Sequence, residues 1–549
     1  CVTSPLLWRV RGARMWARVA ANSGDWIEAV RAYETAIELL GRLVPNWLAR
    51  TDQERLLEEA SGIGCEAAAA CLNAGNVEKA VELFESGRGV LLRNALGLRP
   101  DVALLEDTAP AMANEFERLG RLVERGGSAD GLVDALRKTM TDPRAVTELR
   151  VRQRQDAARQ LDELVADIRR LPGLGEFLSQ KAVMDLLPGP DDGQVVLVNV
   201  CAYRSDALIL FSDRTAVVSL PDLSPDTARE QAELLRVALC TLESDRDDVQ
   251  AQAQMLDVLN WLWSAVARPV LAEIPAAADE SGKPRLARIY WCPSGPLAAM
   301  PLHAASPRRA HHAEGQQSVM DLAVSSTIST ISALTRARQR LVKSPQGEPG
   351  RVLLVAMPQT PGGLDLPGVA AEADYLAKRY PNLVDPLGPD QTTPATCLTV
   401  LSALGSHEWV HFACHAYSDL EAPSRSCLLL QDYQDMPMTV AEIAVQRSRS
   451  ADFAFLSACS TATPSGKLTE ESIHLSSALQ IAGFTHVIGT LWPLCDDDAV
   501  TITRQTYEAL GEPGDARGAA HALRMALVEL RDAHPDQPSR WASHVHSGP

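Results

Sequence analysis

The sequence predicts an all-helical N-terminal region followed by an α/β three-layer sandwich with a mainly parallel sheet. Up to about residue 180, apolar residues recur at the spacing of amphipathic helices. From residue 286 onward, short apolar segments alternate with helical ones, which is typical of parallel-sheet domains. A chain of 549 residues is too long for a single core. We therefore expect two domains, at residues 1–180 and 181–549.

Two segments of the helical region share the same order of small and large residues. Segment 24–37 has Gly-Asp before the helix, then Ala29, and then Tyr33 four residues later. Segment 75–85 repeats this order with Gly-Asn, an alanine and a phenylalanine. The order resembles the second half of tetratricopeptide units, although the copies lie 51 residues apart instead of about 34. We describe the region as tetratricopeptide-like; two ordinary amphipathic helix pairs remain the alternative.

A change from helical to β-strand sequence patterns near residue 190 predicts the domain boundary. The charged helical segment 144–170 interleaves acids with arginines, which indicates a solvated face, and Pro172-Gly173 ends it. The turn cluster Pro-Gly-Pro-Asp-Asp-Gly at 188–193 is followed by a β-branched run at 194–200. The predicted strands are 194–200, 207–211, 216–220, 287–291, 351–356, 409–414, 426–430, 453–458 and 486–491. The predicted helices after the boundary are 225–242, 248–272, 368–380, 394–404, 471–482, 496–510 and 514–532.

Charge and cysteine content exclude several classes of function. A formal net charge of −18 repels phosphate backbones and anionic lipid, so we expect no nucleic-acid or membrane partner. The 11 cysteines form no C-x-x-C pair, which argues against zinc ribbons and thioredoxin-like chemistry. Single scattered thiols are typical of a reducing compartment, so the predicted location is cytoplasmic. Because the sequence begins with Cys1, we expect it to be part of a longer product.

Two predicted strands end in residues that can carry chemistry. The run 409–414 leads into His415, and the run 453–458 leads into Cys459. Both runs are too apolar for surface strands, and sites in parallel sheets form beyond the carboxyl ends of strands. If the strands are neighbours, the imidazole and the thiol face each other at one edge of the sheet.

A histidine beside a cysteine is the pattern of a thiol nucleophile. A nearby imidazolium lowers the pKa of a cysteine several units below its usual value of about 8.5. The imidazole can then protonate the leaving amine, and a backbone N–H can hold the oxyanion. Cys459 follows His415 by 44 residues, close to the roughly fifty-residue spacing of caspases. The alternative for each residue alone is an inert side chain in the core.

Several further stretches, in order, resemble the CHAT family of caspase-like domains, which is associated with tetratricopeptide repeats and related to separase. The resemblance covers roughly residues 190–549. It rests on His-Phe-Ala-Cys-His (411–415), Leu-Ser-Ala-Cys (456–459), Ile-His-Leu (473–475), the segments 290–297, 301–305, 366–368 and 482–492, and a last strand within 541–549.

The resemblance implies a caspase-like fold in which His415 is the general acid/base and Cys459 the nucleophile. The backbone N–H groups of Ala416 and Cys459 would support the oxyanion. The family usually has glycine at the position of Ala416, where a positive φ would be costly for alanine. The family's usual Asp-Glu before the Ser/Ala-Ile-His motif is Glu470-Glu471 here.

Other polar residues have weaker claims to function. Asp496, Asp497 and Asp498 open a predicted helix, so they suit its N-terminal dipole; the other interpretation is a pocket for a basic substrate side chain. We expect His303 and His474 to orient loops or to cap the core. A zinc site is improbable, because alternation sends residues 411 and 415 to one face of the strand and residue 414 to the other.

The leading hypothesis is a cysteine endopeptidase that acts on a protein or peptide substrate and needs no cofactor. The helical region would recruit a substrate or a regulatory protein partner. A catalytically silent interaction scaffold with a peptidase-like fold is the competing hypothesis. A flavodoxin-like small-molecule enzyme is disfavoured because no Gly-rich phosphate loop follows a predicted strand.

Overall fold

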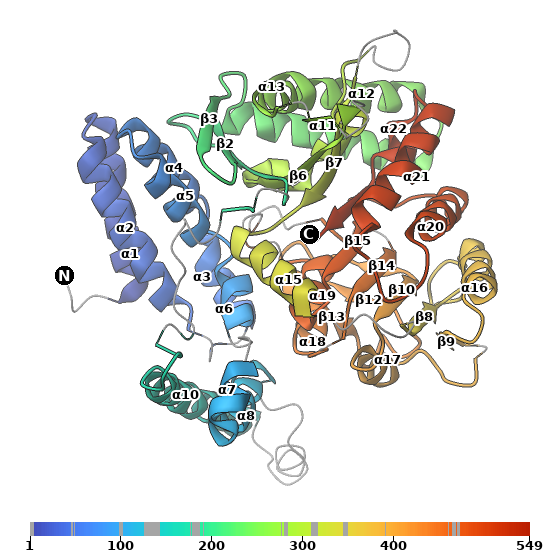
Figure 1. Cartoon of the computed structure of the whole chain (residues 1–549), viewed down its shortest axis with the longest axis horizontal. Helices are drawn as coiled ribbons and strands as arrows, with labels where there is room; N and C mark the ends of the chain where they lie inside the picture. The colour runs from blue at the N-terminus through green and yellow to red at the C-terminus, as the bar shows by residue number, and fades with distance from the viewer. Residues whose placement is uncertain are drawn as a thin grey trace.

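The computed structural model places the helical region beside two β-sheets, with the α/β part running from residue 194 to the C-terminus (Figure 1). The residues that the structure describes are 5–45, 48, 50–97, 103–125, 143–175, 177, 187–189, 192–275, 277–278, 284–308, 317–343, 350–389, 391–448, 450–458, 461–463, 468, 471 and 473–549.

The first six helices form a stacked array whose turns follow from the repeated sequence pattern. Gly24 and Gly75 have positive φ values of 81° and 79°, a conformation that glycine adopts without strain. The next residue in each copy, Asp25 or Asn76, accepts a hydrogen bond from a backbone N–H in the first turn of the following helix. The helices are α1 (Leu6–Asn22), α2 (Trp26–Leu43), α3 (Arg50–Glu58), α4 (Ile63–Asn73), α5 (Val77–Ser86) and α6 (Val90–Gly97).

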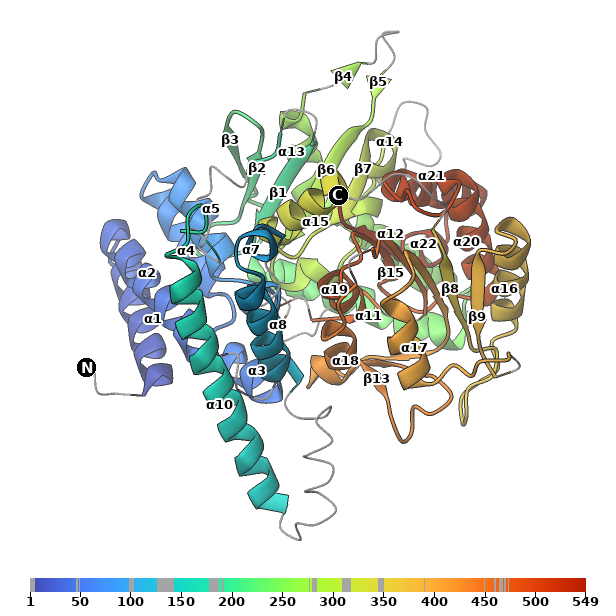
Figure 2. The same ribbon diagram turned by 60° about the horizontal axis from the view of Figure 1, so that its bottom comes forward.

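Three further helices have a small core of their own. Helices α7 (Ala103–Thr108), α8 (Pro110–Arg125) and α10 (Pro143–Ile168) pack through Leu105, Phe116 and Leu161. The long α10 extends away from the rest of the molecule (Figure 2). Its charged surface agrees with the solvated face that the sequence predicts.

The first sheet is mixed and has five strands in the order β3-β2-β1-β6-β7. Strands β1, β6 and β7 are parallel, whereas β2 and β3 are added as antiparallel hairpin strands. Helices α11–α13 cover one face, and helices of the N-terminal array lie against the other. The elements are β1 (Gln194–Asn199), β2 (Asp206–Leu210), β3 (Thr215–Ser219), α11 (Pro225–Ser244), α12 (Val249–Leu262), α13 (Arg268–Glu273), β6 (Ala287–Pro293), β7 (Ala323–Thr327) and α15 (Ile331–Lys343). A short hairpin pairs β4 (Ala277–Ala278) with β5 (Pro284–Arg285).

The second sheet has six strands in the order β16-β15-β14-β10-β8-β9 and is parallel except for β16. One face packs against α16, α20 and α21, and the other against α17, α18 and α19, which makes three layers. The elements are β8 (Val352–Ala356), α16 (Pro367–Arg379), β9 (Val384–Leu387), α17 (Cys397–Leu404), β10 (Trp409–Ala413), α18 (Val440–Ala444), β14 (Phe453–Ser457), α19 (Leu475–Ala482), β15 (His486–Thr490), α20 (Asp496–Leu510), α21 (Ala519–Ala533), α22 (Pro538–Trp541) and β16 (His544–Ser547).

The predicted fold class is confirmed, with corrections in detail. The α/β part contains two large sheets, and no local sequence pattern marks where one ends and the next begins. The predicted strand 426–430 is only two residues long, β12 (Cys427–Leu428), and belongs to a small sheet with β11 (Ala416–Tyr417) and β13 (Met438–Thr439). The predicted helix 248–272 is interrupted by a π-helical turn at Trp263–Ala267.

The two large sheets meet at the edge strands β7 and β16. The Ser326 hydroxyl on β7 lies 2.6 Å from Nδ1 of His546 on β16, and His546 Nε2 lies 3.1 Å from Nδ1 of His486 on β15. His303 and His544 line a small cavity at the same junction. Burial lowers the pKa of His303 to about 4 and that of His486 and His544 to about 3. These histidines are therefore neutral in the folded protein near pH 5.

Lowering the pH should begin to destabilise this junction before most exposed carboxylates become protonated. An unfolded histidine has a pKa near 6.5, so below pH 6.5 the unfolded state binds more protons, and stability falls as the pH is lowered. Each such histidine contributes a slope of about 1.4 kcal/mol per pH unit between roughly pH 6 and pH 4.5. Denaturant unfolding at several pH values should show a shallower slope for His486→Asn than for the parent. Equal slopes would contradict this assignment.

Candidate active site

The pairing of β10 with β14 determines where the two predicted catalytic positions lie. The strands are parallel neighbours, and their last residues, Ala413 and Ser457, are register partners. His415 and Cys459 each come two residues after these partners in the sequence. The structure describes His415, whereas Cys459 lies outside the described residues. The strand arrangement that the sequence required for the pair is therefore present.

His415 is half-buried, and the loop before α16 holds its ring. Its Nε2 lies 2.8 Å from the backbone carbonyl oxygen of Leu364, so Nε2 carries the proton and donates it. In the neutral ring Nδ1 is then the basic nitrogen. Gly363 lies against the ring, since a Cβ at that glycine would be 3.4 Å from Cδ2 of His415. This contact sets both the tautomer and the orientation of the imidazole.

Ala416 is accommodated without backbone strain. It lies in β11 opposite Leu428, and the only described non-glycine residue with positive φ is Asn382. The Leu429 N–H donates to the His415 carbonyl oxygen at 2.9 Å, which makes Ala416 and Leu428 a non-hydrogen-bonded pair. The Ala416 N–H consequently points away from β12 and is not used by this ladder. The expected cost of alanine at this position is absent.

The residues on either side of Cys459 are anchored to the end of β15. The Thr490 hydroxyl donates to the Ala458 carbonyl oxygen at 2.6 Å, and the Thr490 N–H donates to the Thr461 hydroxyl at 2.9 Å. The Ser476 N–H donates to the Thr461 carbonyl oxygen at 3.1 Å. Gly489 permits this close packing, because a Cβ there would lie 2.3 Å from the Ser476 hydroxyl oxygen. The chain before and after the predicted nucleophile is thus fixed.

A buried polar network lies beneath the same edge of the sheet. Glu372 on α16 accepts hydrogen bonds from the Ser457 hydroxyl at 2.9 Å and the Thr503 hydroxyl at 2.8 Å. His411 Nε2 lies 2.9 Å from the carboxylate, and His411 Nδ1 lies 3.2 Å from the Tyr507 hydroxyl. The network joins the ends of β10 and β14 to α16 and α20. Burying it without partners would be costly, so it holds these elements in one arrangement.

Residues 256–549 match the protein family described as the CHAT domain, which is more than half of the chain. The chain belongs to the CHAT domain family. No curated protein matches the sequence. Two crystal structures of the Saccharomyces cerevisiae separase–securin complex, at 2.6 and 3.0 Å resolution, resemble it with TM-scores of 0.50 and 0.49. Each match has 12% sequence identity and covers 95% of this chain but only 37% of the matched chain. The first supports the caspase-like fold.

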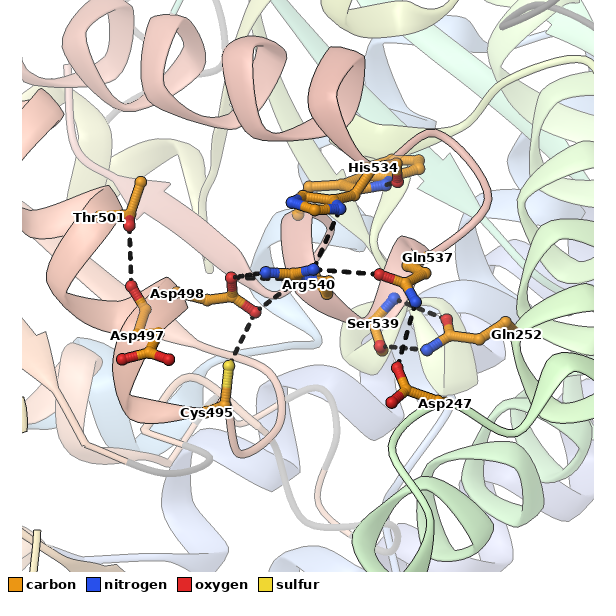
Figure 3. Close-up of polar contacts among 11 residues, drawn as sticks. Asp247, Gln252, Cys495, Asp497, Asp498, Thr501, His534, Gln537, Ser539 and Arg540 are labelled. Atoms are coloured by element: carbon orange, nitrogen blue, oxygen red, sulfur yellow. Dashed lines mark hydrogen bonds and ion pairs between the residues drawn. The ribbon is translucent and has the colours of Figure 1, made fainter.

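The acidic residues that open α20 in the CHAT domain have different environments, and Figure 3 shows two of them, Asp497 and Asp498. Asp498 is buried and forms an ion pair with Arg540 at 2.6 Å, and the Cys495 thiol donates to it at 2.9 Å. Asp496 accepts from the Gly368 N–H at 2.9 Å, at the start of α16. Asp497 is exposed. Two of the three carboxylates therefore have structural partners, and a pocket for a basic side chain stays a prediction.

Other histidines of the CHAT domain form hydrogen bonds that support the start of a helix or join neighbouring elements. His474 accepts a hydrogen bond from the Ser477 N–H at 3.3 Å at the start of α19, and burial lowers the pKa of His474 to about 4. His411 and Cys414 are buried in different cores on opposite faces of β10, as alternation predicts. Within the described part of the chain, no cluster of three or more His, Cys, Asp or Glu residues could hold a metal ion. No described helix is long and apolar enough to cross a membrane.

Three residues at this site were not singled out from the sequence. Leu364 acts through its carbonyl oxygen, which no side-chain pattern reveals. Glu372 lies in an ordinary helical segment, and only the packing of α16 brings it to the strand ends. Thr490 lies in the stretch 482–492 that resembles the CHAT family, and its position near the end of the predicted strand 486–491 was the available signal.

Removing the Thr490 hydroxyl should destabilise the site. Thr490→Val keeps the side-chain shape but leaves the buried Ala458 carbonyl without its donor, which should lower the free energy of unfolding by about 1–3 kcal/mol. Thr490→Ser is the matched control, because it keeps the hydroxyl and should lose less than half as much. Denaturant unfolding measures both, and equal losses would contradict the anchoring role.

Proposed function

We propose that this CHAT domain is a cysteine endopeptidase that uses His415 and Cys459 as a catalytic dyad. The main support is the register of β10 and β14: their last residues, Ala413 and Ser457, are partners at one edge of a parallel sheet, and His415 and Cys459 each come two residues later in the sequence. Membership of the CHAT domain family and the separase-like fold agree with this proposal. The chemistry needs no cofactor.

The proposed reaction has two steps. The Cys459 thiolate attacks the carbonyl carbon of the scissile peptide, and the oxyanion accepts hydrogen bonds from the N–H groups of Ala416 and Cys459. The C–N bond breaks as the His415 imidazolium protonates the leaving amine. A water molecule then attacks the thioester, His415 takes its proton, and the C–S bond breaks to release the carboxylic acid and restore the thiolate–imidazolium pair.

The helical region supports binding of a protein partner. Trp8, Met15 and Val19 lie on one stripe of α1 and are 63%, 64% and 60% exposed. Large apolar side chains grouped on one helix face are typical of interaction surfaces. The same stripe favours the second candidate function, a catalytically silent scaffold. Under either function we propose a cytoplasmic location, no nucleic-acid or membrane partner, and domains at residues 1–180 and 181–549.

Labelling with a peptidyl electrophile that alkylates thiols separates the two functions. Peptidase function predicts an adduct at Cys459, identified by mass spectrometry, and a rate that falls about 100-fold or more in His415→Ala. His521→Ala changes an exposed histidine on α21 and should leave the rate unchanged. The exposed Cys240 serves as an internal reference for an ordinary thiol. If Cys459 reacts like Cys240 and ignores His415, the scaffold function is favoured.

A further inference from the structure

Two buried carboxylates join the helical array to the segments that follow the proposed catalytic residues. Glu54 on α3 is 2% exposed and accepts a hydrogen bond from the Ser424 N–H at 3.1 Å. Glu471 is 5% exposed and accepts from the Leu91 N–H on α6 at 2.8 Å. The partners lie 370 and 380 residues apart in the sequence. Both bonds therefore depend on the packing of the array against the CHAT domain.

The first contact leads directly to His415. Two residues after Ser424, the Ser426 hydroxyl accepts a hydrogen bond from the Asp419 N–H at 2.9 Å. Strand β12 begins at the next residue and pairs with β11, the strand that follows His415. The Leu429 N–H then donates to the His415 carbonyl oxygen at 2.9 Å. The backbone of His415 is thus connected to α3 through the segment 424–429, which is bonded to α3 at Ser424 and to His415 at Leu429.

The second contact leads to Cys459 in a similar way. Three residues after Glu471, His474 caps α19 by accepting from the Ser477 N–H. In the same turn, the N–H and the hydroxyl of Ser476 both lie 3.1 Å from the Thr461 carbonyl oxygen. Thr461 comes two residues after the proposed nucleophile in the sequence.

Both carboxylates lie near the same arginine, so removing either charge would change the electrostatic energy of that arginine. Arg50 on α3 interacts electrostatically with both Glu54 and Glu471, and these charges oppose the lowering of its pKa by burial. One oxygen of Glu54 is buried without a hydrogen-bond partner in the described part of the chain. Nearby, Leu468 lines a small cavity with Leu40 and Leu57. Ser424, through its backbone and its side chain, and the charge of Arg50 offset the cost of burying the Glu54 carboxylate, so its stability depends on partners from both parts of the chain.

We propose that Glu54 and Glu471 are positioning residues through which the helical array sets the reactivity of the His415–Cys459 dyad. This inference rests on the proposed peptidase function. The array then has two roles: it offers a partner surface on α1, and its third and sixth helices hold the two segments that carry the dyad. A partner that moves α3 away from Ser424, or α6 away from Glu471, would change the rate of the thiol's reaction without touching the substrate.

The test measures the rate of Cys459 alkylation from pH 5 to pH 9 in the full chain. Glu54→Gln and Glu471→Gln remove one charge and place amide hydrogens where only an acceptor was present. Asp52→Asn is the control, since it removes one charge from the exposed side of α3. We expect each Gln variant to slow alkylation at pH 7 about tenfold. We also expect the midpoint of the pH–rate profile to move up toward that of an ordinary thiol, near 8.5.

A purely structural role would lower the melting temperature and leave the midpoint of the pH–rate profile in place. If both Gln variants behave like Asp52→Asn while the parent shows His415-dependent labelling, the inference is overturned and the peptidase function stands. If the parent shows no His415-dependent labelling, the peptidase function and the positioning role of the two glutamates are both contradicted. Glu54→Asp and Glu471→Asp keep the charge but draw each carboxylate back by one methylene group, and they provide the same readout should a Gln variant not fold. An unchanged rate and midpoint in both Asp variants would overturn the proposal.

Discussion

The parallel pairing of β10 with β14 is the interaction on which the rest of the account depends. It aligns Ala413 with Ser457, so the two strands that precede His415 and Cys459 in the sequence end side by side at one edge of the sheet. A shift of one residue would turn every side chain of a strand to the other face. The side chains of both strands are packed into cores on the two faces, so such a shift would move each of them into the opposite core, where its size and shape do not fit.

Buried polar groups fix the elements around these strands. Glu372 ties α16 and α20 to the strand ends, Thr490 ties β15 to the turn after β14, and Glu54 and Glu471 tie the helical array to the neighbouring segments. Each carboxylate takes donors from a distant part of the chain. A packed apolar core would stabilise the fold as well, but directed bonds select one arrangement. Selecting one arrangement matters at a catalytic site, because the reacting groups must be held within a fraction of an ångström of the productive geometry.

Much of this architecture follows from local sequence patterns. The exceptions are elements and residues whose role depends on distant parts of the chain and leaves no local pattern. The β10, β14 and β15 segments were predictable because central parallel strands are continuous apolar runs. The edge strand β9, with Pro386 and an ion-paired Asp385, has no such run, and Ala323–Thr327 of β7 is too small and polar to be recognised. His415 was found because it ends an apolar run. Glu372 was not, since its partners come from three other elements.

The distance between the sulfur of Cys459 and the nearer ring nitrogen of His415 in a crystal structure of the reduced protein would test the pairing of the two groups most directly. We expect a separation within about 4 Å, close enough for a hydrogen bond or for a small adjustment to form one. A thiol on the opposite face of the sheet, or separated from the imidazole by an intervening side chain, would contradict it.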